Sequence, residues 1–189
     1  MANKNVVKEV LKVAVILFAI TAVAAAILAA VNKVTAPVIA ENDRKAQEAA
    51  MRVVLPDATE FIPVAVNEIS VDGVQVTEEV YQSDKGYAVK VAPNGYGGPI
   101  SIIVGVDDDL KVTGIKIISQ SETAGLGAKC TELSFQEQFK GKTENIIVSK
   151  SGAKGNEIDA ISSATVTSKA VTKGVNRAIS VVKAVKEAE

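Results

Sequence analysis

Residues 13–31 form an unbroken apolar run, which constrains the fold of this chain more than any other feature of its sequence. The run reads VAVILFAITAVAAAILAAV, contains no charged residue and carries a single hydroxyl, at Thr21. Its length is close to the roughly 20 residues that an α-helix needs to cross the hydrocarbon core of a bilayer. We therefore predict a transmembrane helix over residues 13–31, within an N-terminal segment of residues 1–34.

A secretory signal peptide is the competing interpretation of this run. The apolar core of such a peptide is usually about 7 to 15 residues long and ends at a cleavage site of small residues. Residues 24–26 are alanines, but they lie inside the run, which continues to Val31. The length of the run therefore favours an anchor that the protein keeps.

Basic residues on either side of the run bear on its orientation. Three lysines lie in residues 4–12 and three basic residues lie in residues 33–45, so the counts are equal. The lysines before the run lie closer to it, and the amino terminus adds a positive charge. We predict a single-pass protein of the cell (inner or plasma) membrane, with its N-terminus in the cytoplasm and its domain outside.

The composition excludes several classes of chemistry. Cys130 is the only cysteine and histidine is absent, so the chain alone supplies no internal disulfide, iron–sulfur site or histidine-bound metal. The formal net charge of -1 gives no general attraction to nucleic acid. The acidic run 107–109 is interpreted as a hairpin turn rather than a cation site. We predict no catalytic side chain and no metal, but a protein that holds a cofactor.

Residues 35–56 connect the anchor to the rest of the chain. We expect Thr35-Ala36-Pro37 to interrupt the first helix and residues 38–54 to form a second, stalk helix with a thin apolar face. Pro56 ends this helix, because proline disfavours helical geometry in the residue before it. Residues 57–189 then form the domain.

The domain has the pattern of an α+β fold. Between about residues 68 and 120, apolar residues alternate with period two, as at Tyr87, Val89 and Val91, which predicts strands. Residues 130–139 predict a short helix and residues 146–148 another strand. An apolar face in residues 166–186 predicts a long C-terminal helix.

A cluster of hydroxyl side chains lies just before this C-terminal helix. Its members are Ser162, Ser163, Thr165, Thr167 and Ser168. One interpretation is helix capping, for which a single hydroxyl is sufficient. The other is a phosphate site, because a helix start presents free N–H groups and a positive dipole end, and one hydroxyl is available for esterification. The pattern alone leaves both interpretations open.

The segment 159–168 resembles the flavinylation motif of the FMN-binding domain family. That motif has an Asp, two spacers, Ser or Thr, usually Gly, then Ala, Ser or Thr, one spacer, and the Thr that a flavin transferase modifies. The matching residues are Asp159, Ser162, Ala164, Thr165 and Thr167, with Ser163 where glycine is usual. The resemblance implies an antiparallel-sheet domain with FMN bound by a phosphoester to Thr167. The departure at Ser163 affects any tight backbone contact that a glycine at this position would allow.

Two glycine-bearing segments resemble other parts of the same family. Residues 94–100 (NGYGGPI) match its glycine-tyrosine-glycine-glycine turn, and residues 122–129 (ETAGLGAK) resemble its second glycine loop, with Ala124 where proline is common. In an FMN site the glycines let backbone amides approach the flavin ring, while side chains pack on the ring or bond to its polar edge. The candidates are Tyr96, Gly97, Gly98, Glu122, Thr123, Gly125, Leu126, Gly127 and Lys129.

Within this family the anchor, stalk and short domain are most similar to the G subunit of the Rnf complex, a membrane assembly that couples electron transfer between ferredoxin and NAD to ion movement. The resemblance implies an electron-carrier subunit of a multi-subunit oxidoreductase. Its partners are the other membrane, iron–sulfur and flavin subunits and, during maturation, a flavin transferase. The alternatives are the C subunit of the sodium-translocating NADH:quinone reductase, a solitary extracytoplasmic flavoprotein shuttle, and a cofactor-free membrane-tethered binding module.

Overall fold

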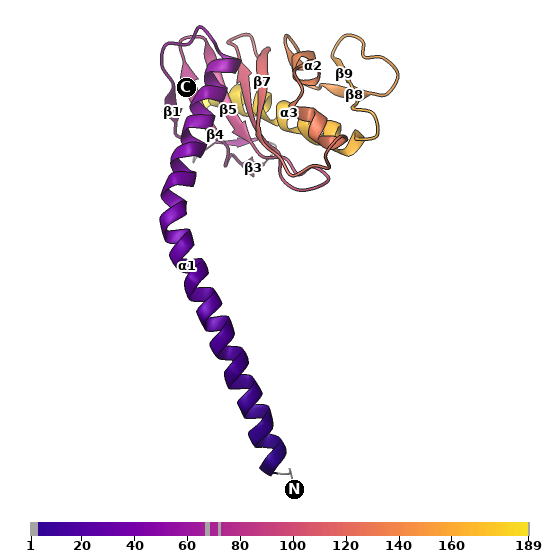
Figure 1. Ribbon diagram of the computed structural model, residues 1–189. Coiled ribbons are helices and arrows are strands. Elements are labelled where there is room, and N and C mark those ends of the chain that lie inside the picture. The colour runs from indigo at the N-terminus through magenta and orange to yellow at the C-terminus, as the bar shows by residue number, and fades with distance from the viewer. Residues whose placement is uncertain (1–3, 67–68, 72, 189) are drawn as a thin grey trace. The chain divides into compact units, whose positions relative to one another are not determined.

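The computed structural model describes residues 4–66, 69–71 and 73–188 (Figure 1). The predicted segments include residues outside this description: 1–3 in the N-terminal segment, 68 and 72 in the predicted strand region, and 67 and 189 in the predicted domain. The chain divides into two compact units, Met1–Lys45 and Ala46–Glu189.

Helix α1 spans Lys4–Val54 and contains the whole apolar run. Large apolar side chains of the run are exposed, among them Leu17, Phe18 and Leu28. An exposed apolar surface of this kind marks a site of contact with a membrane or with another protein. Among the described residues, α1 is the one helix that is long and apolar enough to cross a membrane.

The predicted interruption at Thr35-Ala36-Pro37 is wrong, because α1 continues through Pro37. Residues 38–54 are helical as predicted, but they are the C-terminal part of α1. Proline inside a helix removes one N–H donor and costs about 3 kcal/mol. Long helical segments lie on both sides of Pro37, and the helix continues through it without a break.

The centre of the second unit is a five-stranded antiparallel sheet, which confirms the predicted α+β class. Its strands, in spatial order, are β1 (Ile62–Val64), β4 (Glu79–Ser83), β5 (Gly86–Val91), β6 (Ser101–Val106) and β7 (Val112–Ser119). The acidic run between β6 and β7 is a turn, in which the Asp107 carboxylate accepts the N–H of Lys111 at 2.8 Å. Two small pairs complete the strands: β2 (Ser70–Val71) with β3 (Val74–Gln75), and β8 (Ile147–Ser149) parallel to β9 (Glu157–Asp159).

The remaining helices follow the sheet in sequence. The predicted helix at 130–139 is a succession of three short turns: η1 (Gly127–Thr131), α2 (Leu133–Gln136) and η2 (Glu137–Phe139). The predicted C-terminal helix is confirmed as α3 (Thr165–Ala188).

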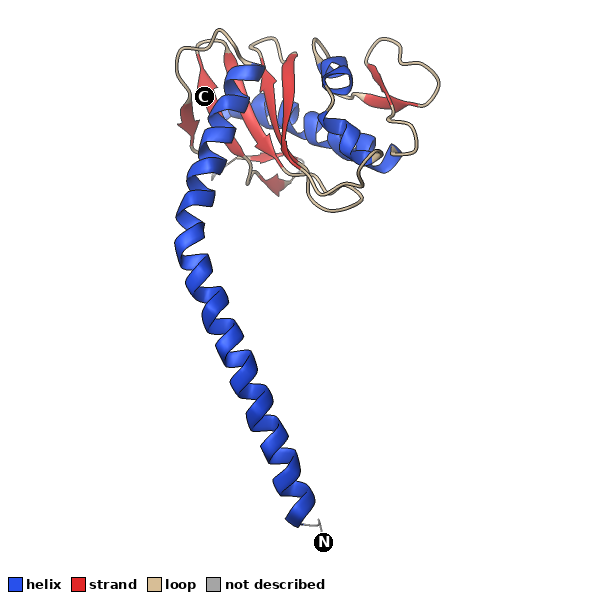
Figure 2. Ribbon diagram, viewed as in Figure 1, coloured by secondary structure: helices blue, strands red, loops and turns tan. Residues whose placement is uncertain are grey.

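Apolar side chains from both faces of the sheet are buried, because a helix covers each face (Figure 2). Alternate residues of β5 point in opposite directions. Val89 belongs to the core that the sheet shares with α3, where it joins Val175, whereas Ala88 joins Met51 in the core shared with the end of α1. The period-two pattern of the sequence therefore describes a sheet that is packed on both sides.

The end of α1 offers a direct test of this packing. Val54 is 1% exposed and Val53 is 59% exposed, although the two residues are neighbours of the same type. We expect Val54→Ala to lower the free energy of unfolding by roughly 2 kcal/mol through lost burial and a residual cavity, and Val53→Ala to change it by less than about 0.5 kcal/mol. Urea unfolding of both variants measures the difference, and equal losses would contradict the packing described.

Candidate functional site

Ser163 lies in the turn that precedes α3. The turn before the helix closes through a hydrogen bond from the Ala164 N–H to the Ile161 carbonyl at 3.0 Å. Ser163 lies in this turn with φ 61°, in the left-handed region that glycine enters without steric cost. A non-glycine residue there is strained by about 1 kcal/mol. The serine is therefore accommodated, and the helix begins at Thr165.

A pocket of about 550 Å³ lies at this end of α3. Its volume falls in the range of roughly 300–1,000 Å³ that is typical of cofactor sites. The residues that line it come from three segments distant in the sequence: Tyr96, Glu122, Thr123, Leu126, Gly127, Ser163, Ala164, Thr165, Val166 and Thr167. The fold thus brings residues of both glycine-bearing segments and three members of the hydroxyl cluster, Ser163, Thr165 and Thr167, to one place.

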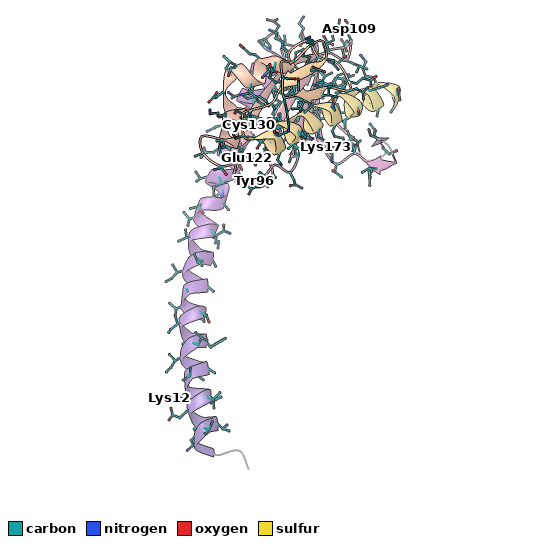
Figure 3. The ribbon with its side chains drawn as sticks, turned by 90° about the vertical axis from the view of Figure 1, so that its right-hand side faces the viewer. Lys12, Tyr96, Asp109, Glu122, Cys130 and Lys173 are labelled. Atoms are coloured by element: carbon teal, nitrogen blue, oxygen red, sulfur yellow. The ribbon has the colours of Figure 1, made fainter. Side chains whose placement is uncertain are left out.

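Glu122 connects these three segments through its carboxylate. The Thr167 hydroxyl donates to Glu122 Oε2 at 2.5 Å, and the Gly97 N–H donates to Glu122 Oε1 at 2.8 Å. Thr167 is 1% exposed and Glu122 8% exposed, so the bond between them is shielded from water, whereas the bond from Gly97 is partly buried. Figure 3 shows Glu122 close to Tyr96 and to Cys130, near α3. Asp109 lies far from these residues.

Two of the glycines are required by close packing around this carboxylate. A Cβ atom on Gly97 would lie 2.1 Å from the Ser121 carbonyl oxygen. A Cβ atom on Gly127 would lie 2.5 Å from Glu122 Oε2 and 2.7 Å from Thr167 Oγ1. These glycines therefore allow the loops to close on Glu122 and Thr167. At Gly98 and Gly125 the reason for glycine is the backbone conformation, since their φ values are positive, at 151° and 76°.

The other candidate residues lie away from this pocket. Lys129, Asp159 and Ser162 line a second hollow of about 230 Å³. Asp159 accepts the Ala153 N–H at 2.8 Å. Ser168 is fully buried, accepts the Ile161 N–H at 2.9 Å and donates to the Ala164 carbonyl. The motif is thus divided, with its last residues facing the larger pocket and its first residues facing the smaller hollow.

Val166 lines the larger pocket although the sequence did not single it out. It occupies the spacer position of the motif and is 54% exposed. A valine in the spacer position at the start of the predicted helix was the signal available in the sequence. It adds an apolar contact beside Thr167.

Cys130 is fully buried near the same carboxylate. Burial, and then the negative charge of Glu122, raise the pKa of its thiol from the ordinary 9.0 to about 11. The folded thiol is therefore neutral and a poor nucleophile at neutral pH. This environment agrees with a structural role for the thiol.

The raised pKa of Cys130 predicts a pH dependence of stability. Below the unfolded value of 9.0 the thiol is protonated in both states, so its contribution is fully present. As pH rises toward 11, the unfolded state loses the proton first, and stability falls by up to about 1.4 kcal/mol per pH unit. We expect Cys130→Ala to lack this component in unfolding measured at pH 8 to 11. An identical decline in both proteins would contradict the assignment.

Comparison with known proteins identifies similar sequences over most of the chain. The FMN-binding domain family profile matches residues 95–180, and the profile described as the RnfG N-terminal region matches residues 1–54. The chain is 41% identical to the G subunit of the Na⁺-translocating ferredoxin:NAD⁺ oxidoreductase complex of Acetobacterium woodii, over 92% of each chain. It is 38% identical to the G subunit of the proton-translocating complex of Clostridium ljungdahlii, over 81% of this chain and 80% of the relative.

Solved structures share the fold at lower sequence identity. The C subunit of the Na⁺-translocating NADH-quinone reductase from Parabacteroides distasonis superposes with a TM-score of 0.55 and 24% identity, over 75% of this chain and 90% of that chain. NqrC from Shewanella oneidensis superposes with a TM-score of 0.51 and 17% identity, over 71% of this chain and 74% of that chain. These similarities establish the architecture of the domain.

Proposed function

Because the chain belongs to the family of G subunits of ion-translocating oxidoreductase complexes, we propose that it is a membrane-anchored electron carrier with FMN bonded covalently to Thr167. The complex is a ferredoxin:NAD oxidoreductase of the Rnf type, and the other subunits carry the substrate sites. One observation carries the attachment site: Thr167 matches the modified threonine of the motif and also lines a pocket of cofactor size.

The residues around the pocket suit FMN from its phosphate to its ring. The first turn of α3 presents N–H groups without intrahelical partners, and its dipole favours the negative charge of a phosphodiester at Thr167. Tyr96, Leu126 and Val166 are exposed apolar side chains on the pocket wall, where they can cover a flat ring. Bound FMN supplies one-electron transfer, and the phosphoester prevents loss of the cofactor.

The membrane arrangement is part of the proposal. Residues 13–31 cross the membrane once, residues 35–56 connect the span to the domain, and residues 57–189 bind FMN. The N-terminus lies in the cytoplasm and the domain outside, as the basic residues before the span favour. The match of residues 1–54 to the RnfG N-terminal region favours an Rnf-type complex over a C-type subunit or a solitary shuttle.

The decisive experiment measures the intact mass of the membrane-extracted chain, co-expressed with its flavin transferase, together with in-gel flavin fluorescence after denaturation. The proposal predicts one esterified FMN per chain and co-purification of the other complex subunits. An unmodified mass and a dark band would favour a cofactor-free tethered binding module. Covalent flavin without partner subunits would favour a solitary shuttle.

A further inference from the structure

We propose that Glu122 accepts the proton of the Thr167 hydroxyl when the FMN phosphoester forms, and that it retains this proton in the finished flavoprotein. The inference rests on the proposed attachment of FMN to Thr167. It assigns Glu122 to the maturation reaction, which differs from the contact with the flavin edge expected from the sequence.

The distance and direction of the hydrogen bond support this role. The Thr167 hydroxyl already donates to Glu122 Oε2 at 2.5 Å, within the reach required of a general base. Because the hydroxyl donates its proton to Glu122, the lone pairs of Oγ1 are not used in this bond, and Thr167 is among the residues that line the pocket. Among the described residues that line the pocket, Glu122 is the only carboxylate.

The carboxylate is held in position before any flavin arrives. Its second oxygen accepts the Gly97 N–H at 2.8 Å, and the Glu122 N–H donates to Gln120 Oε1 at 2.5 Å. Gly127 packs directly against Glu122 Oε2 and Thr167 Oγ1. Contacts of this kind fix the pair of reacting oxygens and reduce the entropy lost on reaching the transition state.

The step balances with a flavin adenine dinucleotide as the donor. The Oγ1–H bond of Thr167 breaks and an Oγ1–P bond forms to the phosphorus on the FMN side. The P–O bond of the pyrophosphate breaks, and AMP leaves with its electron pair. The Thr167 proton moves to Glu122 Oε2, and nothing is oxidised or reduced.

The product explains why the proton stays. Esterified Thr167 no longer donates a hydrogen bond, and its phosphodiester carries a negative charge next to a buried carboxylate. Two adjacent negative charges in a shielded site repel each other. A proton on Glu122 would remove this repulsion, and the neutral carboxyl group would be a hydrogen-bond donor beside the esterified oxygen.

The test follows FMN attachment to the full-length chain in detergent, with purified flavin transferase, flavin adenine dinucleotide and Mg²⁺, by intact mass over time. We expect Glu122→Gln to slow the initial rate by about 100-fold or more, the usual contribution of a general base, and to reach the same final mass. Glu137→Gln, a matched change at an exposed glutamate, should leave the rate unchanged.

A second variant separates proton acceptance from a structural role. Formate should accelerate attachment to Glu122→Ala by at least tenfold, since it can replace the missing carboxylate, whereas chloride should not. A wild-type rate in Glu122→Gln, or a Glu122→Ala rate that formate leaves unchanged, would overturn the proposal and leave the Thr167 linkage standing. Absence of attachment to the wild-type chain would instead remove the proposed function.

An infrared difference spectrum of the wild-type protein tests the retained proton without any variant. Flavinylation should add the carbonyl band of a protonated carboxyl group, compared with the unmodified chain. A spectrum that lacks this band would overturn the proposal even if Glu122 variants fail to fold.

Discussion

Thr167→Ala is expected to remove covalent FMN completely, because alanine has no oxygen with which to form the phosphoester. Intact mass and in-gel fluorescence of the co-expressed protein measure this loss. The variant should also lose about 1–3 kcal/mol of stability, since Glu122 Oε2 is left in a shielded site without its donor. This exceeds the roughly 1 kcal/mol expected for removing a hydroxyl that only caps a helix start.

Two controls locate the attachment within the motif. Thr167→Ser keeps a hydroxyl at the same position and should retain covalent FMN. Ser168→Ala should retain it as well, because the Ser168 hydroxyl is engaged with Ile161 and Ala164 inside the start of α3. Covalent FMN on Thr167→Ala would contradict the assignment, and its loss from Ser168→Ala would move the site by one residue.

Gly97→Ala is expected to destabilise the domain by about 3 kcal/mol and to disrupt the pocket, because it forces apart two backbone segments. The added Cβ would lie 2.1 Å from the Ser121 carbonyl oxygen, and backbone atoms cannot move aside as a flexible side chain can. The shift would also break the Gly97 N–H bond to Glu122. Thermal unfolding and the extent of FMN attachment should both report the change.

Gly125→Ala provides the matched control for Gly97→Ala. Gly125 has a φ of 76°, but a Cβ there would meet no atom within 4 Å. Its substitution therefore carries only the conformational strain of about 1–2 kcal/mol. If Gly125→Ala proved as damaging as Gly97→Ala, close packing would not be the reason for glycine at residue 97.

Local patterns predicted much of the fold, because each depends on neighbours in the chain. The apolar run lies within α1, the alternation at Tyr87, Val89 and Val91 became β5, and the apolar face of residues 166–186 became α3. The interruption at Pro37 was wrong because a local penalty was overcome by long helical segments on both sides.

The sequence predicted a candidate site, but it could not predict the contacts within it. The resemblance supplied Thr167 and the two glycine segments. It did not reveal that Glu122 bonds to Thr167, that Val166 lines the pocket, or that Asp159 and Ser162 face a separate hollow. Each of these contacts depends on how distant loops pack.

The sequence by itself determined the elements of this protein: an apolar run long enough for a membrane, strands of period two, a terminal helix and a hydroxyl cluster at its start. These follow from local periodicity and capping chemistry, which act over a few residues. Only the tertiary structure decided that Gly97, Glu122 and Thr167 meet. Gly97 lies 25 positions before Glu122, and Thr167 lies 45 positions after it. Their contact depends on sheet register and on glycines that admit close backbone packing.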